Sequence, residues 1–212
     1  MAKASSSYFR LTLIVLAGLA LTASAYGNAI FTAFQTDPNL LGEENVPFNT
    51  SQTGTMIDGF AGPTKVQFSS PTTLTASAGS NAFSAVNADV GAVINSLTIT
   101  LPLGDTFGDF IVGMHKVPPP TIEFNVVATM SDGTTRTSQD FRFTGNTTTF
   151  LTVTTTGGAK ITKLTFNSPS TGFSTLSNIR ISDIEPIPEP SSMLLLGSGV
   201  LVFAQVLRRK LS

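Results

Sequence analysis

The chain has no cysteine, no tryptophan and a single histidine, His115. The missing cysteine excludes disulfide bonds, thiolate zinc sites and cysteine nucleophiles. A Ser-His-Asp triad would depend on His115 alone, and a zinc site would need carboxylates for nearly all of its ligands. Only 12% of the residues are charged, so the surface must consist largely of Ser, Thr, Asn and Gly. That composition is typical of extracellular bacterial β-proteins.

The few charges are unevenly distributed. Five of the 12 basic residues lie near the chain ends, namely Lys3, Arg10, Arg208, Arg209 and Lys210. Residues 26–187 hold seven basic and twelve acidic residues, a net charge of −5. An acidic domain without a basic patch does not suit nucleic acid, because phosphates require Lys and Arg. We therefore expect no nucleic-acid partner.

The N-terminus has the three parts of a signal peptide. Lys3 and Arg10 form a positive region, and Leu11–Leu21 is an apolar core. Ala23 and Ala25 then fit the small-x-small pattern of a signal peptidase site, which predicts cleavage after Ala25. An uncleaved anchor or a buried helix is the alternative for this stretch. The prediction is that residues 1–25 form a signal helix, with signal peptidase and the export machinery as partners.

The middle of the chain shows short alternating runs separated by turn residues, and no stretch with a convincing helical period. Residues 35–64 show little periodicity and are interpreted as a long loop or a short irregular β-segment. In Thr121–Met130 the even-numbered residues face one side, and Ser131–Gly133 predicts a tight hairpin turn after it. The other candidate strands are Lys65–Phe68 and Thr72–Ala76 on either side of Pro71, Val93–Leu101, Phe107–Val112, Thr134–Phe143, Thr148–Thr155, Lys160–Phe166 and Leu176–Ser182.

Hairpin spacing of this kind predicts an all-β fold, an antiparallel β-sandwich that is jelly-roll-like. An immunoglobulin-like topology is the alternative. Phenylalanine, with 16 copies, is expected to supply most of the core. In the last strand Ile179 and Ile181 should point inward, and Asn178, Arg180 and Ser182 outward.

The C-terminus has a second targeting pattern. Pro188-Glu189-Pro190 lies in a Pro-rich linker, which is followed by the apolar run Met193–Leu207 and then Arg208, Arg209 and Lys210. As a helix the run is about 22 Å long, short of a bilayer core of about 30 Å. Snorkelling by the basic residues and local thinning close this gap, and the positive-inside rule keeps the basic cluster in the cytoplasm. A C-terminal core helix is the alternative, although this run has almost no polar face.

This order of triplet, apolar span, basic cluster and chain end resembles the PEP-CTERM sorting signal of exported bacterial proteins. The same kind of tail is also labelled an ice-binding-protein C-terminal domain, a label that implies no ice binding here. The resemblance implies recognition by a membrane enzyme, the exosortase, with cleavage near Pro188-Glu189-Pro190 and delivery to the cell surface or an exopolysaccharide matrix. Residues 141–150, the turn at 157–158 and the stretch LSNIRIS also resemble, more loosely, the β-sandwiches that precede such tails.

Candidate catalytic residues have simpler structural interpretations. His115 has Asp105 and Asp109 nearby in sequence, but the ectodomain has no Gly-x-Ser-x-Gly elbow, and a solvent-facing loop beside the Pro run is the preferred interpretation. Paired carboxylates would suit a glycosidase. Each candidate is more simply a turn or solvated residue: Asp58, Asp89, Asp105, Asp109, Glu123 and Asp140.

Two classes of ligand remain open for the sandwich: carbohydrate, and self or protein–protein association. A structural calcium ion would find oxygen donors at the two ends of the domain, in Asp37, Glu43, Glu44, Asp183 and Glu185, although no spacing matches a dedicated loop. We therefore commit to no cofactor and no metal site. A stacked sugar site is disfavoured, because Tyr8 leaves with the signal peptide and Tyr26 is the only other tyrosine.

The sequence therefore predicts a signal peptide (1–25), a β-sandwich ectodomain (26–184), a Pro-rich linker (185–192), a transmembrane helix (193–207) and a basic cytoplasmic tail (208–212). The expected protein is exported, held in the cytoplasmic membrane by one C-terminal helix, and then delivered to the cell surface or matrix. We expect a non-catalytic structural or binding module, with exopolysaccharide as a candidate partner. A secreted carbohydrate-active hydrolase is the alternative.

Overall fold

A computed structural model describes residues 27–34, 36–38, 42–79, 85–88, 92–115, 121–144 and 148–186. Over these ranges the fold is all-β, and its only helical element is the 3-10 turn η1 (Pro102–Gly104). No helix within the described ranges is long and apolar enough to cross a membrane. The predicted signal peptide with Ala23 and Ala25, the sorting triplet Pro188, Glu189 and Pro190, the apolar run 193–207, and Arg208, Arg209 and Lys210 lie outside the described residues.

The described strands are β1 (Ala29–Phe34), β2 (Glu44–Asn45), β3 (Gln52–Ala61), β4 (Thr64–Ala76), β5 (Ala85–Ala88), β6 (Ser96–Thr100), β7 (Asp105–Thr106), β8 (Phe110–His115), β9 (Thr121–Met130), β10 (Thr135–Thr137), β11 (Phe141–Thr144), β12 (Thr149–Thr155), β13 (Ile161–Asn167), β14 (Thr175–Ile181) and β15 (Glu185–Pro186). All of their pairings are antiparallel.

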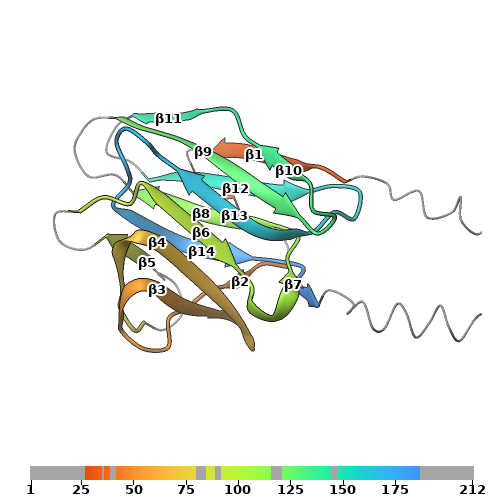
Figure 1. The fold of residues 1–212 in the computed structure, drawn as a ribbon, viewed down its shortest axis with the longest axis horizontal. Coiled ribbons are helices and arrows are strands. Elements are labelled where there is room, and N and C mark those ends of the chain that lie inside the picture. The colour runs from red at the N-terminus through yellow and green to blue at the C-terminus, as the bar shows by residue number, and fades with distance from the viewer. Residues whose placement is uncertain are drawn as a thin grey trace, which may run out of the picture.

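One 13-stranded sheet folds back on itself to make the two layers, in the order β1-β12-β8-β14-β5-β4-β6-β13-β9-β10 (Figure 1). The sheet nearly closes into a barrel. Its two edge strands, β1 and β10, come close enough for the side chain of Arg136 in β10 to donate to the side chain of Asn28 beside β1, at 3.1 Å. The predicted antiparallel all-β class is confirmed. The two layers are halves of one sheet.

The long strand β4 connects the layers, and it replaces the two short strands predicted on either side of Pro71. Residues Gln67–Ser69 of β4 pair with β6, whereas Leu74 and Thr75 pair with β5. Pro71 lies between these two stretches and is exposed. Its missing N–H therefore removes no ladder bond, which is why proline is tolerated inside this strand.

The region predicted to be loop, residues 35–64, contains the ten-residue strand β3 and the short β2. Strand β3 forms a long hairpin with β4, with a register shift between Gly54 and Met56. Gly59 lies under the segment before β3, since an added Cβ there would be 2.6 Å from Val46 Cγ1. Glycine in β3 thus serves close packing, and it also hides the strand pattern in the sequence.

The other predicted strands are found with shifted ends. Thr121–Met130 is β9 with the predicted faces, since its even-numbered residues are all buried. The single strand predicted over Thr134–Phe143 is wrong. It is divided into β10 and β11, which both pair with β9.

The last strand follows the prediction up to its end. Ile179 and Ile181 are buried, but Ser182 is only 4% exposed instead of facing outward. Asn178 takes a positive φ of 49°, in the register shift between Ser177 and Arg180. The bulge lets this strand pair with β8 on both sides of the irregularity.

Phenylalanine fills the space between the layers, as predicted. Phe124 lies at the centre of an aromatic cluster, with ring centroids 5.4 Å from Phe141, 5.0 Å from Phe143 and 6.4 Å from Phe166. Phe166 in turn contacts Phe110 at 6.0 Å. Offset and edge-on ring pairs of this kind stabilise a core beyond the effect of area burial alone.

Candidate functional site

The segment that leads into the C-terminal tail is held against the body of the domain. Residues 182–186, here called the C-terminal stem, follow β14. Their last part, β15, pairs with β7, and the Thr106 hydroxyl donates to the Glu185 carbonyl at 3.0 Å. This pairing extends into the predicted linker. Since only Ile187 separates Pro186 from Pro188, the sorting triplet follows directly after the point where the chain is held.

Asp109 holds the beginning of the stem. Its backbone carbonyl accepts from Ser182 N–H at 3.1 Å, and its Oδ2 accepts from the Ser182 hydroxyl at 3.2 Å. Its Oδ1 accepts from Thr155 N–H in β12 at 3.0 Å. These bonds explain why Ser182 is buried. They also make Asp109, a candidate triad member, a structural carboxylate that joins the stem to the sheet.

Gly108 lets the stem approach closely. Its N–H donates to the Ser182 carbonyl at 3.0 Å. A Cβ on Gly108 would lie 2.8 Å from the Asp183 Cβ, a distance that side chains cannot tolerate without movement. Only glycine fits here with the stem in its observed place.

Lys160 binds the stem from the side. Its Nζ lies 3.1 Å from Glu185 Oε1, 4.0 Å from Asp183 Oδ2 and 3.3 Å from the Asp183 carbonyl. The lysine side chain is 19% exposed, whereas that of Glu185 is 63% exposed. Because exposed ion pairs contribute only about 0–1 kcal/mol, the contact directs the stem more than it strengthens it. Sequence reasoning missed Lys160, since nothing in the local pattern links it to residues 183–185.

Both ends of the described domain meet at the same turn. The N–H of Asn28 donates to Thr156 Oγ1 at 3.3 Å, and the N–H of Thr156 donates to the Asn28 carbonyl at 2.9 Å. Lys160, a few residues later, contacts the stem. Figure 1 shows the start of β1 and the end of β15 at the same end of the molecule.

Four of the five candidate calcium donors are paired with two basic side chains. Arg180 pairs with Asp37 and with Glu43, whose Oε2 lies 2.8 Å from Arg180 Nη1. Asp183 and Glu185 contact Lys160 instead, and an added Cβ on Gly62 would lie 2.9 Å from Glu44 Oε2. No group of three or more candidate ligands occurs in the described ranges. The basic residues occupy the place that a cation would take, so we propose no calcium site.

Four of the candidate catalytic residues have other contacts or positions. Asp58 pairs with Lys65 at 2.9 Å, and Glu123 pairs with Arg142 at 3.2 Å. Asp140 accepts from Asn125 at 3.4 Å. Asp89 lies outside the described residues. Asp58 is in β3, Glu123 is in β9 and Asp140 directly precedes β11, and all three are partners of neighbouring side chains.

The backbone of His115 is the last position of β8, opposite Thr175 in β14. The prediction of a loop position for His115 is therefore wrong. The strand continues to this residue because the start of β14 pairs with it.

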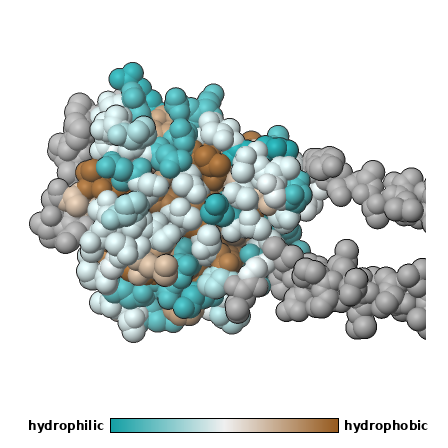
Figure 2. Space-filling model, in the orientation of Figure 1, coloured by the Kyte–Doolittle hydropathy of each residue, from teal (hydrophilic) through white to brown (hydrophobic). Residues whose placement is uncertain are grey.

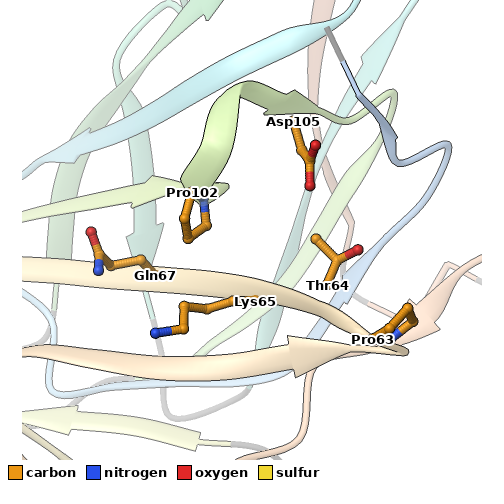
Figure 3. A pocket seen from close by; sticks show the side chains of 6 residues that line it. All are labelled: Pro63, Thr64, Lys65, Gln67, Pro102 and Asp105. Carbon is orange, nitrogen blue, oxygen red and sulfur yellow. The ribbon is translucent and has the colours of Figure 1, made fainter.

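A pocket of about 430 Å³ lies beside the β3–β4 hairpin and contains one of the candidate carboxylates, Asp105 (Figure 3). The residues that line it are Pro63, Thr64, Lys65, Gln67, Pro102 and Asp105. Asp105 and Pro102 stand on one side, and the hairpin residues stand on the other. Two proline rings thus face a small number of polar groups, an arrangement that can hold a small polar group but lacks the acid pair of a glycosidase.

The pocket adjoins a sheet face covered by hydroxyl and amide groups. Residues in register across β3, β4, β6, β13 and β9 form three rows, here together called the polar face: Asp58, Gln67, Thr100, Lys163 and Thr129; Met56, Ser69, Thr98, Thr165 and Val127; Ser96, Asn167 and Asn125. These side chains are exposed or half-buried. Figure 2 shows the corresponding side of the molecule as mainly hydrophilic to neutral, with small separate hydrophobic areas.

Asp132 has the clearest electrostatic perturbation. Hydrogen bonds from the Thr134 hydroxyl at 2.7 Å and the Thr134 N–H at 2.8 Å lower the pKa of Asp132 below its ordinary value of 3.8. This residue lies in the β9–β10 hairpin turn, as predicted. Its role is to shape the turn.

Comparison with known proteins identifies the tail. Residues 186–210 match the family model of the PEP-CTERM protein-sorting motif. No curated protein matches the chain. The Family 11 carbohydrate-binding module of the cellulosomal cellulase Lic26A-Cel5E of Clostridium thermocellum aligns with 76% of this chain and 98% of its own length, at 8% identity and a TM-score of 0.25. The proposals below therefore depend on the residues of this chain.

The chain thus carries a PEP-CTERM protein-sorting motif, as its residues predicted. The motif indicates an exported protein that is anchored in the membrane before an exosortase processes it. The first residue of the motif, Pro186, is also the last residue of β15.

Proposed function

We propose that this protein is an exported, non-catalytic β-sandwich of the cell surface or extracellular matrix. Its sorting signal is the C-terminal motif, read by an exosortase-type membrane enzyme that cuts near Pro188-Glu189-Pro190. The observation that carries the proposal is the match of residues 186–210 to the sorting motif. The predicted signal peptide, the apolar run Met193–Leu207 and the basic cluster supply the other parts of this route.

The stem supports this proposal by its position. Because β15 ends at Pro186, the triplet begins two residues along the chain from the last residue that pairs with the body of the domain. The enzyme would therefore act close in sequence to Glu185, which Lys160 and Thr106 hold against the domain.

Fractionation of producing cells tests the sorting step. Pro188, Glu189 and Pro190 are replaced together by alanine, with Gln139→Ala, an exposed position in the domain, as control. We expect the triple variant to be exported but retained in the cytoplasmic membrane at full length, and the control to reach the surface or medium like the native chain. Equal distribution of all three proteins contradicts sorting by this motif.

A secreted carbohydrate-active hydrolase is the second candidate, and the pocket at Asp105 is the observation that favours it. Asp105 is the only carboxylate among the described residues that line it. A panel of glycoside substrates tests this alternative with the native protein and Asp105→Asn. Turnover that the substitution abolishes would establish the enzyme, and we expect no turnover by either protein.

A further inference from the structure

We infer that the polar face binds a neutral polysaccharide, laid across the strands with one part in the pocket at Pro102. This inference rests on the proposed function, because a matrix protein meets such polymers outside the cell. It names the face and the chemical class of the ligand. Two of the side chains that line the pocket, Lys65 and Gln67, are on the same strand as Ser69 of the polar face. The pocket and the face therefore form one continuous surface.

The hydrogen-bonding groups of the face are arranged in registered rows. In the row farthest from the pocket, Ser96 donates to Asn167 and Asn167 donates to Asn125, each at 3.4 Å. In the middle row the hydroxyls of Thr98 and Thr165 are 3.4 Å apart. These bonds are long and use only part of each group's capacity, since an amide has two donors and an acceptor with two lone pairs. Unused donors and acceptors remain for a ligand rich in hydroxyls.

The geometry of the sheet suits an extended polymer. Neighbouring strands lie about 4.8 Å apart, and residues on the same face of one strand are about 6.8 Å apart. Thr98, Thr165 and Asn167 thus lie on a regular grid on neighbouring strands. A chain with repeated hydroxyl groups can contact several positions of this grid at once, so contacts that are individually weak add up along its length.

The charge of the face selects against other partners. The Asp58–Lys65 ion pair lies at one edge of the face, and Glu123 of β9, beyond Asn125, is paired with Arg142 of β11. Lys163 of β13 lies between them. With residues 26–187 at a net charge of −5, nucleic acid and anionic polysaccharides are repelled by the domain as a whole. A protein partner would use an apolar centre, whereas Met56 and Val127 are the apolar members of the three rows.

The pocket compensates in part for the missing aromatic platform. Sugar-binding sites generally need an apolar surface for the C–H faces of the ring in addition to polar groups. Pro63 and Pro102 supply that surface, while Gln67, Lys65 and Asp105 supply hydrogen-bonding groups. We expect weak binding per sugar, because two proline rings offer less contact area than a tryptophan.

Affinity electrophoresis tests the inference. The protein recovered from producing cells is run in native gels that contain dextran, hydroxyethyl cellulose or, as an anionic polymer, alginate. The variant Thr165→Val/Asn167→Ala removes polar groups from two rows. Its matched control, Asn49→Ala/Thr50→Val, changes the same residue types in an exposed bend. We expect at least one neutral polymer to slow the migration of the native protein. The Thr165→Val/Asn167→Ala variant should bind that polymer about tenfold more weakly, because it loses about two hydrogen bonds, and the control variant should bind it like the native protein.

A measurement on the native protein covers the case in which the variant misfolds. The side-chain amide signals of Asn125 and Asn167 are followed by NMR as dextran or hydroxyethyl cellulose is added. We expect both signals to shift at lower polymer concentrations than the signal of Asn49. Retardation by alginate alone, equal binding of both variants, or unshifted Asn125 and Asn167 signals overturns the inference. Absence of all binding with intact sorting overturns it as well, while the proposed sorting function stands.

Discussion

Lys160 Nζ lies 3.1 Å from Glu185 Oε1, and this ion pair joins the turn after β12 to the residue that precedes the sorting motif. The two residues are far apart in sequence, and the lysine is the more buried of the two. The base of the tail is therefore positioned by the tertiary fold. The predictions below begin with this contact.

Removal of the Lys160 ammonium should loosen the stem without unfolding the domain. We expect Lys160→Met to lower the free energy of unfolding by about 0.3–1 kcal/mol, since its acidic partners are solvent-exposed. Hydrogen exchange at Glu185 should become faster in the same variant. The matched control is Lys163→Met, on the polar face. If Glu185 exchanges equally fast in all three proteins, Lys160 does not hold the stem.

An alanine at position 108 should displace the stem. The added Cβ would meet Asp183 at 2.8 Å, so we expect Gly108→Ala to cost about 1–3 kcal/mol of unfolding free energy, as overpacking does elsewhere. The control is Gly79→Ala, where the nearest atom would be 4.0 Å away. Urea denaturation of the two variants makes the comparison. Equal stability of Gly108→Ala and the native chain would show that the stem does not lie against Gly108.

Truncation of Phe124 should cost far more than truncation of a surface phenylalanine. Phe124 is 2% exposed and contacts the rings of Phe141, Phe143 and Phe166. We expect Phe124→Ala to cost about 3–5 kcal/mol, through lost burial and the cavity left behind. Phe34→Ala, at a side chain that is 39% exposed, should cost less than about 1 kcal/mol. Thermal denaturation of both variants measures the two losses of stability. Similar losses in Phe124→Ala and Phe34→Ala would contradict the observed core.

The hairpin turn should show a pH-dependent contribution from Asp132. Because the two hydrogen bonds from Thr134 lower its pKa below 3.8 in the folded state, the ionised side chain favours folding at neutral pH. This contribution is present above the unfolded pKa and is lost as pH falls from about 3.8 through the lower, folded value. The stability difference between the native chain and Asp132→Asn should therefore shrink in that window.

An NMR titration checks the cause. In Thr134→Val, which removes the hydroxyl donor, the pKa of Asp132 should return toward its ordinary value. An Asp132 titration unchanged by this substitution would mean that the hydroxyl does not perturb the carboxylate.

The sequence predicted β9 and its hairpin well, because the even-numbered residues of Thr121–Met130 alternate cleanly and Asp132-Gly133 is a strong turn signal. It missed β3, whose buried positions include Gly59 and Ala61. Small residues carry little hydrophobic signal, and the close approach of Val46 explains why residue 59 is glycine. The hydrophobic sequence pattern of a strand is weak where another segment packs so closely on the strand that small residues are needed.

The tail motif could be predicted from the sequence because its parts are consecutive. The stem could not, since Thr106, Asp109 and Lys160 reach residues 182–186 only through the pairing of strands distant along the chain. The acidic residues at the domain ends were candidate oxygen donors for calcium. Sequence alone does not show that two of them pair with Arg180 and two others with Lys160.

The shared position of the two ends also determines which way the domain faces. Asn28 and the stem both attach around Thr156–Lys160, and the loop Ser168–Gly172 lies at the other end of the sandwich. Whatever the tail is finally joined to, this loop then lies at the end of the domain opposite the point of attachment, and the polar face lies along the side of the domain between these two ends. A circular permutant that links Gly27 to Pro186 and opens the chain within that loop would keep every strand pairing but reverse the orientation of the domain relative to its point of attachment.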